Sequence, residues 1–127
     1  MYKRQIRDRK VKQTPLKDVA GIFRSFHYAI YATIFDTKNK YSIDQKDLFE
    51  AGEKYYECAT SLFLDIYLET AQSNALDIGY NPEVKYLLKY HMLEKAIYEL
   101  GYELNARPDW LIIPLTGVFQ LLNNENN

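Results

Sequence analysis

Cysteine, histidine, glycine and proline are all scarce in this chain of 127 residues. The single cysteine, Cys58, excludes an internal disulfide, so a reducing, cytoplasmic setting is expected. Because Cys58 lies within an apolar helical pattern, we interpret it as a small buried side chain. The only histidines are His27 and His91, which leaves little general-base chemistry at neutral pH. The sequence has no Gly-rich phosphate loop, metal-spaced His/Cys set or nucleophile elbow, so these residues by themselves do not make an enzyme.

Long hydrophobic runs and an excess of charge of either sign are also missing. No window reaches the length of a transmembrane span, and residues Met1 to Gln5 lack the apolar run of a secretory signal. The net charge of -1 gives no global reason to expect binding to nucleic acid or to a membrane. The sequence therefore predicts a soluble protein without a membrane partner.

What the chain does have is the composition of one globular domain. Its length is enough for a single core, and 47% hydrophobic with 26% charged residues argues against disorder. Aromatic residues make up 15% of the chain and include 12 tyrosines, which is high for a small helical bundle. Some of these rings are therefore expected at interfaces rather than in the interior.

The hydrophobic periodicity predicts an all-α fold, a bundle of about four or five helices without strands. Thr14 and Pro15 have the form of a cap and a first helical residue. Residues Ser42 to Gln45 have the form of a capping box that begins a second helix, which continues to near Ala71. The apolar stripes of these two helices are Val19, Ala20, Phe23, Ile30 and Ile34, and Leu48, Gly52, Tyr55, Ala59, Leu62 and Ile66. His27 lies near the first stripe, and we interpret it as a core histidine rather than a ligand.

A third helix is predicted with Asn81 as its cap and Pro82 as its first residue, and it ends at Arg107; a last helix runs from Pro114 to about Leu122. The third helix has an apolar stripe, expected to face the core, of Met92, Leu93, Ala96, Ile97, Leu100 and Leu104. Its opposite side carries His91, Lys95, Tyr98 and Tyr102, flanked by Glu94 and Glu99. Tyrosine rings with polar tips beside a lysine suit a carbohydrate surface, while a second packing face is the alternative interpretation. Both interpretations remain open at this point.

The first twelve residues are strongly basic. They contain Lys3, Arg4, Arg7, Arg9, Lys10 and Lys12 against the single acid Asp8. Such a run is formally a nucleic-acid or phosphate signal, but no aromatic ladder or recognition helix accompanies it, which favours a solvated connecting segment. The chain thus divides into a basic connecting arm at 1–13, a helical domain at 14–122 and a disordered tail at 123–127.

Two blocks of the sequence resemble the C-terminal part of bacterial maltokinases, particularly the form fused behind trehalose synthase. The first block is PLKDVAGIFRSFHYA, from Pro15 to Ala29. The second is LEKAIYELGYELNARPDW, from Leu93 to Trp110, followed by Ile113-Pro-Leu. The stretch around Tyr55 to Tyr67 is similar but less specific, and the likeness extends from about Val11 to Leu122.

This resemblance implies the helical C-terminal subdomain of a protein-kinase-like sugar kinase of the aminoglycoside-phosphotransferase type. Such kinases transfer the γ-phosphoryl group of ATP, held with Mg²⁺, to the anomeric hydroxyl of maltose and so produce maltose 1-phosphate. Their catalytic-loop Asp after a His-Gly pair and their metal-holding Asp-Phe-Glu stretch are absent here; Asp47-Leu-Phe-Glu50 falls within the second helical pattern. The resemblance places this chain just after the metal site of the kinase. The chain alone is therefore expected to be inactive and to hold no cofactor.

In the family the matching helix lines the maltose site. The residues that carry over by position as substrate-binding are Lys95, Tyr98, Glu99, Tyr102 and Arg107. The tyrosine rings would pack on the apolar faces of a glucosyl unit, while Lys95 and the tyrosine hydroxyls would bond its hydroxyls. Glu103 and Asn105 are alternates for the polar contacts. Arg107 has an equal structural interpretation, in which it pins the corner formed by residues 108–110.

The partners that the resemblance implies are maltose or a related α-glucoside, the remainder of the kinase domain and, in a fusion, the trehalose synthase domain. Trehalose, maltose and α-glucan metabolism is the corresponding setting. An isolated subdomain would expose the apolar surface that meets the rest of the kinase, so a homodimer is expected. Two alternatives stay open: an autonomous helical module that binds a protein through its tyrosine-rich face, and a nucleic-acid binder that uses the basic arm.

Overall fold

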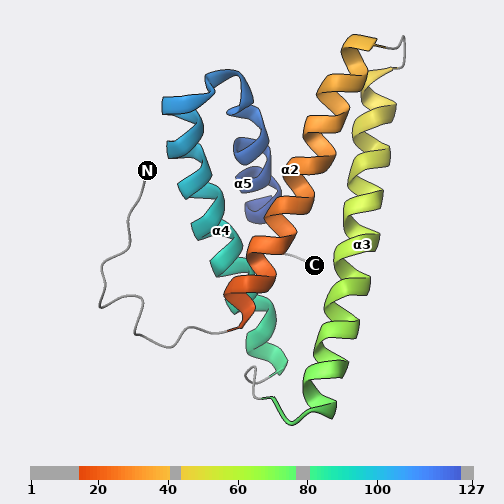
Figure 1. Ribbon diagram of the computed structural model, residues 1–127, viewed down its shortest axis with the longest axis vertical. Helices are drawn as coiled ribbons and strands as arrows, with labels where there is room; N and C mark the ends of the chain where they lie inside the picture. Colours follow the sequence, from red (N-terminus) through yellow and green to blue (C-terminus); the bar gives the residue numbers. More distant parts are fainter. Residues whose placement is uncertain (1–14, 41–43, 77–80, 124–127) are drawn as a thin grey trace.

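The structure, a computed structural model, describes residues 15–40, 44–76 and 81–123. It consists of α2 (Leu16–Lys40), α3 (Gln45–Ser73), α4 (Asn81–Ala106), a 3-10 turn η1 (Pro108–Trp110) and α5 (Ile112–Asn123) (Figure 1). No strand occurs within these ranges, so the all-α prediction is confirmed for the described chain. The basic arm, Thr14, Ser42 and residues 124–127 of the tail lie outside the described residues.

The helices are arranged around α2, which packs against each of the other three α-helices. Helix α3 runs antiparallel beside α2, and α4 and α5 form an antiparallel hairpin on the opposite side, joined through η1 (Figure 1). Among the described elements the backbone of α3 comes close only to α2. Helices α2 and α4 run in the same general direction (Figure 1).

The ends of the helices follow local chemistry. The cap of α3 is Asp44, whose Oδ1 accepts a hydrogen bond of 2.9 Å from the backbone N–H of Lys46, so the predicted start at Ser42 is two residues too early. Helix α4 ends at Ala106, one residue before the predicted end, because Pro108 forces the preceding Arg107 out of the helical conformation. Helix α5 begins at Ile112, two residues earlier than predicted.

The C-terminal end of α3 carries an unusual alanine. The N–H of Leu76 donates to the carbonyl of Ala71 at 2.9 Å, and the N–H of Ala75 donates to the carbonyl of Gln72 at 3.1 Å. This is the Schellman pattern, in which the residue after the cap adopts a left-handed conformation that favours glycine. Here that residue is Ala75, with a φ of 54°. The end of α3 therefore carries local backbone strain.

The core lies where α2, α3 and α4 meet. Val19, Ala20 and Phe23 of α2 pack with Leu88 and Met92 of α4. The partly buried side chains that pack against this cluster are Phe26, Tyr56, Phe63, Leu64, Tyr67 and Leu121. The predicted buried stripe of α2 is confirmed at Val19, Ala20, Phe23 and Ile34, whereas Ile30 is only partly buried.

The predicted stripe of α3 is wrong at three of its six residues, while Leu48, Gly52 and Ala59 are partly buried. Tyr55, Leu62 and Ile66 are exposed, while Tyr56 and Phe63, one position further along, pack on the core. Cys58 lies on the same outer side and is exposed, in contrast to its interpretation as a buried side chain. The reason is that α3 is apolar on two adjacent faces, and periodicity alone does not say which of them meets α2. Gly52 faces α2: an added Cβ would lie 2.8 Å from Ile34 Cδ1, so this glycine lets the two helices approach closely.

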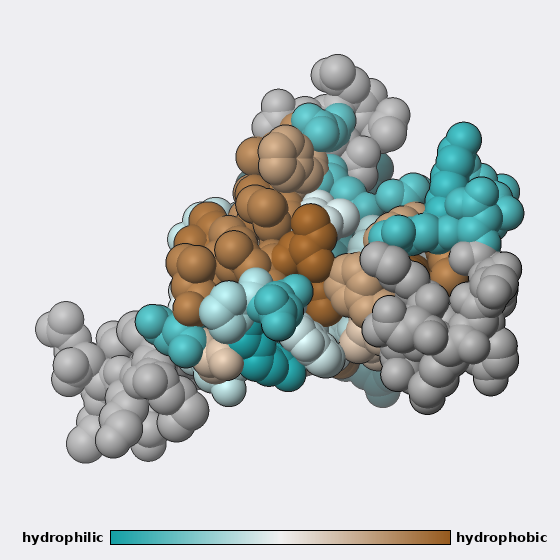
Figure 2. Space-filling view, turned by 90° about the horizontal axis from the view of Figure 1, so that it is seen from above, coloured by the Kyte–Doolittle hydropathy of each residue, from teal (hydrophilic) through white to brown (hydrophobic). Residues whose placement is uncertain are grey.

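The α4–α5 hairpin also exposes apolar side chains. Ile97 and Leu104, which were predicted to face the core, are each 60% exposed. Together with Ile112, Leu115, Phe119 and Leu122 of α5 they are here called the outer apolar face. Figure 2, seen from above, shows hydrophobic residues gathering over this side of the molecule. None of the described helices combines the length and apolar character that a membrane crossing requires.

Candidate functional site

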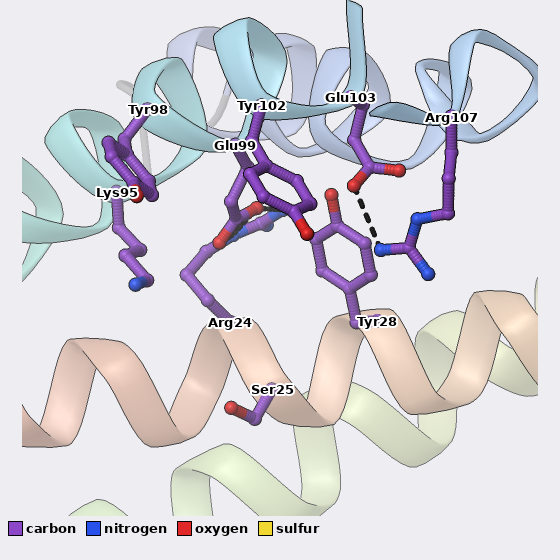
Figure 3. Close-up of a pocket in the computed structure, with 9 residues that line it drawn as sticks. All are labelled: Arg24, Ser25, Tyr28, Lys95, Tyr98, Glu99, Tyr102, Glu103 and Arg107. Atoms are coloured by element: carbon purple, nitrogen blue, oxygen red, sulfur yellow. Dashed lines mark hydrogen bonds and ion pairs between the residues drawn. The ribbon is translucent and has the colours of Figure 1, made fainter. Parts of the chain in front are cut away.

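A cavity of about 280 Å³ opens between α2 and α4. Its lining residues are Arg24, Ser25 and Tyr28 of α2, Lys95, Tyr98, Glu99, Tyr102 and Glu103 of α4, and Arg107 at the end of α4 (Figure 3). All five residues named from the sequence as substrate-binding line this single cavity. Of the two alternates, Glu103 also lines it, whereas Asn105 does not and instead donates to the carbonyl of Gly101 at 3.1 Å.

Helical spacing explains why these side chains meet. Lys95, Tyr98 and Tyr102 follow one another at three- and four-residue intervals, so they project from one side of α4. Arg24 and Tyr28, four residues apart on α2, project from the facing side (Figure 3). The cavity is therefore the seam between two helices that run in the same direction.

The tyrosines at the mouth of the cavity are not sealed in the core. Tyr98 is 38% exposed and Tyr102 is 46% exposed. The ammonium group of Lys95 lies 5.3 Å from the centre of the Tyr98 ring, a cation–π contact, and the side chain extends from α4 toward α2 (Figure 3). The mouth thus presents flat rings next to a hydrogen-bond donor.

The floor of the cavity is a buried ion pair. Arg24 Nη2 donates to Glu99 Oε2 at 2.7 Å, and Arg24 Nε donates to the same oxygen at 3.1 Å and to Oε1 at 3.3 Å. Arg24 is only 2% exposed, and both groups lie between α2 and α4. The planar guanidinium matches the two carboxylate oxygens, so the pair is held in one orientation.

A second ion pair closes the other end of the cavity. Arg107 Nη2 donates to Glu103 Oε1 at 2.9 Å, and its guanidinium also lies over the Trp110 ring at 4.3 Å. The hydrogen bond to Glu103 raises the pKa of Arg107 above its ordinary value. Among the described residues, Glu103 Oε2 is buried without a hydrogen-bond partner. Arg107 thus contacts the corner at η1, in agreement with its structural interpretation, and it also lines the cavity, where substrate binding stays a prediction.

Tyr28 supplies a hydroxyl from the α2 side. Burial, and then the nearby carboxylates of Glu99 and Glu103, raise the pKa of Tyr28 above its ordinary value. The phenol therefore stays protonated at neutral pH and is available as a hydrogen-bond donor. The neighbouring Ser25 is different, because its hydroxyl donates to the carbonyl of Gly21 at 3.0 Å and serves its own helix.

Sequence reasoning missed the α2 wall, formed by Arg24, Ser25 and Tyr28. One signal for Arg24 was present: it falls in the same helical stripe as Ala20 and His27, both of which are buried. A charged residue within an apolar stripe indicates a buried ion pair, since an isolated buried charge is very costly. No comparable signal marks Tyr28, whose role depends on how close α4 comes.

The chemistry of the cavity is amphipathic and nearly neutral. Its lining contains three cations and two carboxylates, an excess of one positive charge, and four of these five groups are paired with each other. Such a lining suits a neutral ligand with both hydroxyl groups and apolar faces. Within the described ranges, no group of three or more His, Cys, Asp and Glu side chains is placed to hold a metal ion.

In a comparison with models of known protein families, no family model matches the chain.

Proposed function

We propose that this chain is the acceptor-binding portion of an ATP-dependent maltokinase, which converts maltose and ATP to maltose 1-phosphate. The observation that carries this proposal is the convergence of Lys95, Tyr98, Glu99, Tyr102 and Arg107 on one solvent-open cavity. The periodicity places Lys95, Tyr98 and Tyr102 on one face of the helix with Glu99 at its flank, and the resemblance adds Arg107. Helical periodicity alone does not require that a facing helix leave a cavity at this level of α4.

The cavity has the chemistry that a glucosyl unit requires. A pyranose ring has apolar C–H faces and a rim of hydroxyls, so it is bound by aromatic rings together with polar groups. Tyr98 and Tyr102 provide exposed rings, and Lys95 provides a donor beside them. Tyr28 adds a protonated hydroxyl from the opposite wall. In this proposal Glu99 shapes the floor of the cavity and Arg107 shapes one end, because each is engaged in an ion pair.

The size of the cavity suits one sugar ring. Its volume of about 280 Å³ lies just below the range of roughly 300–1,000 Å³ that is usual for ligand sites. A second glucosyl unit of maltose would extend toward the open side, where the phosphoryl donor must also lie. Residues outside this chain would then bind ATP and Mg²⁺ and supply the catalytic Asp, since this sequence has no His-Gly-Asp or Asp-Phe-Glu stretch. A trehalose synthase fusion acting in cytoplasmic α-glucan metabolism is the setting that the resemblance implies.

The test is a maltose titration of the chain, followed by NMR of the tyrosine ring signals. We expect maltose to shift the signals of Tyr98 and Tyr102, and we expect the combined substitution Lys95→Ala with Tyr98→Ala to abolish the remaining shift at Tyr102. Tyr86→Ala is the matched control, because Tyr86 is an exposed tyrosine of α4 that does not line the cavity. An unresponsive wild-type protein, or an undiminished Tyr102 response in the double variant, would contradict the proposal.

A second candidate function, association with a protein partner, is favoured by the outer apolar face. Isolated exposed hydrophobic residues are common on soluble proteins, but a stripe at helical spacing on two adjacent helices is typical of an interface. In α5 the exposed positions are Ile112, Leu115, Phe119 and Leu122, at three- and four-residue intervals. This face consists of different residues from the cavity lining, so the two functions are tested separately.

A further inference from the structure

Two oppositely charged neighbours on α4 do not pair with each other. Lys95 and Glu99 are four residues apart, a spacing at which lysine and glutamate on a helix commonly form an ion pair. Instead, Glu99 directs both carboxylate oxygens to Arg24, and the Lys95 ammonium lies over the Tyr98 ring (Figure 3). Across the described part of the chain, no ion pair joins Lys95 to a carboxylate.

The geometry explains why Arg24 takes the carboxylate. Its guanidinium makes a forked contact with Glu99, with the shortest distance 2.7 Å, in a site where Arg24 is almost fully buried. Lys95, by contrast, is exposed and offers a single, strongly hydrated charge. Charge-assisted, two-point hydrogen bonds away from water outweigh a one-point contact at the surface.

The position of Arg24 depends in turn on α5. Gly117 is buried on the side of α5 that faces the guanidinium, and a Cβ added there would lie 2.9 Å from Arg24 Cζ and 3.0 Å from Nη2, with Nη1 closer still. These approaches are too close for a real Cβ, so a larger residue at this position requires a shift, and the end of the flexible Arg24 side chain is the group that moves at the lowest cost. Three helices therefore meet at one side chain: α2 supplies Arg24, α4 supplies its partner and α5 supplies the space.

We propose that Arg24 is a positioning residue for the sugar site. By holding both oxygens of Glu99 it keeps that carboxylate from capturing Lys95, and the ammonium remains available to ligand hydroxyls. Gly117 does not line the cavity, but it leaves the space that the Arg24 guanidinium needs in order to hold this position. The inference rests on the proposed carbohydrate site and adds to it the means by which its donor is kept available.

Gly117→Ala tests the arrangement without changing any residue that lines the cavity. Gly101→Ala and Gly21→Ala are matched controls, because both glycines lie within helices and an added Cβ at either meets nothing within 4 Å. All three substitutions favour the helix to a similar degree, so a difference between them reports on Arg24. We expect Gly117→Ala to weaken maltose binding by about tenfold or more, as for a lost charge-assisted contact, and the controls to stay within about twofold.

A rescue distinguishes positioning from a general structural effect. Glutamine at position 99 has the same shape as glutamate but cannot form an ion pair with Lys95. Adding Glu99→Gln to Gly117→Ala should therefore restore most of the lost affinity, whereas damaged packing would not be repaired. Arg24→Lys serves as the second variant if Gly117→Ala does not fold, because it keeps the charge but loses the fork that occupies both oxygens.

A measurement without ligand separates the two proposals. Because Lys95 Nζ lies 5.3 Å from the centre of the Tyr98 ring, the adjacent ε-methylene protons should show ring-current-shifted NMR signals in the wild type and in Gly101→Ala. In Gly117→Ala these signals should move toward solvent values, with new contacts to Glu99. If the Lys95 signals move in this way while the wild-type protein shows no response to maltose, the role of Arg24 in keeping Lys95 from Glu99 is supported and the proposed sugar site is contradicted. If neither the Lys95 signals nor maltose binding change in Gly117→Ala, the positioning is overturned.

Discussion

His27 makes the stability of the helical domain sensitive to mild acid. It is 2% exposed, and its ring lies 4.5 Å from that of Tyr31 and 5.5 Å from that of Tyr56. Its Nε2 lies 3.2 Å from Gln120 Oε1, and its Nδ1 has no partner among the described residues. Burial, followed by the positive charge of Arg24, lowers the pKa of His27 from 6.5 to about 4.

The hydrogen-bond network around Gln120 determines which ring nitrogen of His27 carries the proton. The Gln120 amide nitrogen donates to the hydroxyl of Tyr31 at 3.2 Å and to Glu53 Oε1 at 3.1 Å, so its carbonyl oxygen faces the histidine. His27 therefore donates from Nε2 and carries its lone pair on Nδ1. Protonation would place a second N–H in a dry site without an acceptor. Glu53 of α3 is the acid that faces this network. It reaches His27 only through Gln120, so it does not offset the free-energy cost of protonating His27.

The sign and size of the effect follow from the two pKa values. Between pH 6.5 and about 4 the unfolded chain binds a proton at His27 that the folded chain does not. The free energy of unfolding is therefore undiminished above pH 6.5 and falls as the pH drops through this window. A change in pKa of this size corresponds to about 3 kcal/mol, since each pKa unit is worth about 1.4 kcal/mol. That is a large share of the stability expected of a small domain.

The assay is urea unfolding of wild type and of His27→Gln at a series of pH values from about 7 to about 4. Glutamine keeps a polar group that reaches Gln120 but does not titrate, so the difference between the two curves isolates His27 from the carboxylates. We expect wild type to lose about 3 kcal/mol more than the variant over this window. Parallel curves, or a His27 ring signal that titrates near its ordinary pKa in the folded protein, would refute the reasoning.

Two further predictions concern the end of α3 and the outer apolar face. Ala75→Gly should raise the free energy of unfolding by about 1 kcal/mol, because glycine adopts the left-handed conformation at this position without strain. The control Ala51→Gly, at an exposed position in the interior of α3, should lower the free energy of unfolding by about 1 kcal/mol. Urea unfolding measures both changes, and a loss of stability in Ala75→Gly would contradict the prediction. The wild-type chain should associate with increasing concentration in analytical ultracentrifugation, and Phe119→Glu should weaken association while Tyr55→Glu on α3 leaves it unchanged; a strictly monomeric wild-type profile would count against an interface at this face.

The helices themselves could be predicted because their limits are set by nearby residues. Pro108 ends α4 through its effect on Arg107, and that helix begins at Asn81, one residue before the predicted first helical residue Pro82. The errors at other ends are small, such as the start of α5 at Ile112 rather than Pro114. A capping or breaking residue acts within one turn, so its effect can be read from the chain without knowledge of the fold.

The faces of the helices could not be predicted in the same way. Ile97 and Leu104 are exposed, while Glu99 and Glu103 on the neighbouring face are buried. Glu99 can be buried because Arg24, 75 residues earlier in the chain, neutralises it. A count of apolar residues assigns carboxylates to the solvent side, and only the tertiary partner reverses that assignment. The same reasoning applies to the cavity, whose α4 wall could be named from the sequence but whose α2 wall exists only through the approach of two helices.

The buried pair of Arg24 and Glu99 is better explained by the cavity than by stability. Two charges taken out of water lose much of their hydration, and apolar side chains of similar volume usually hold a core at least as well. The pair also depends on a glycine, Gly117, which weakens α5 as a helix. A purely structural core does not need this ion pair. Its place at the floor of the cavity, in one fixed orientation, indicates that it orients a group of the site. What it orients is the carboxylate next to Lys95, the one cation of the cavity lining that no described carboxylate neutralises.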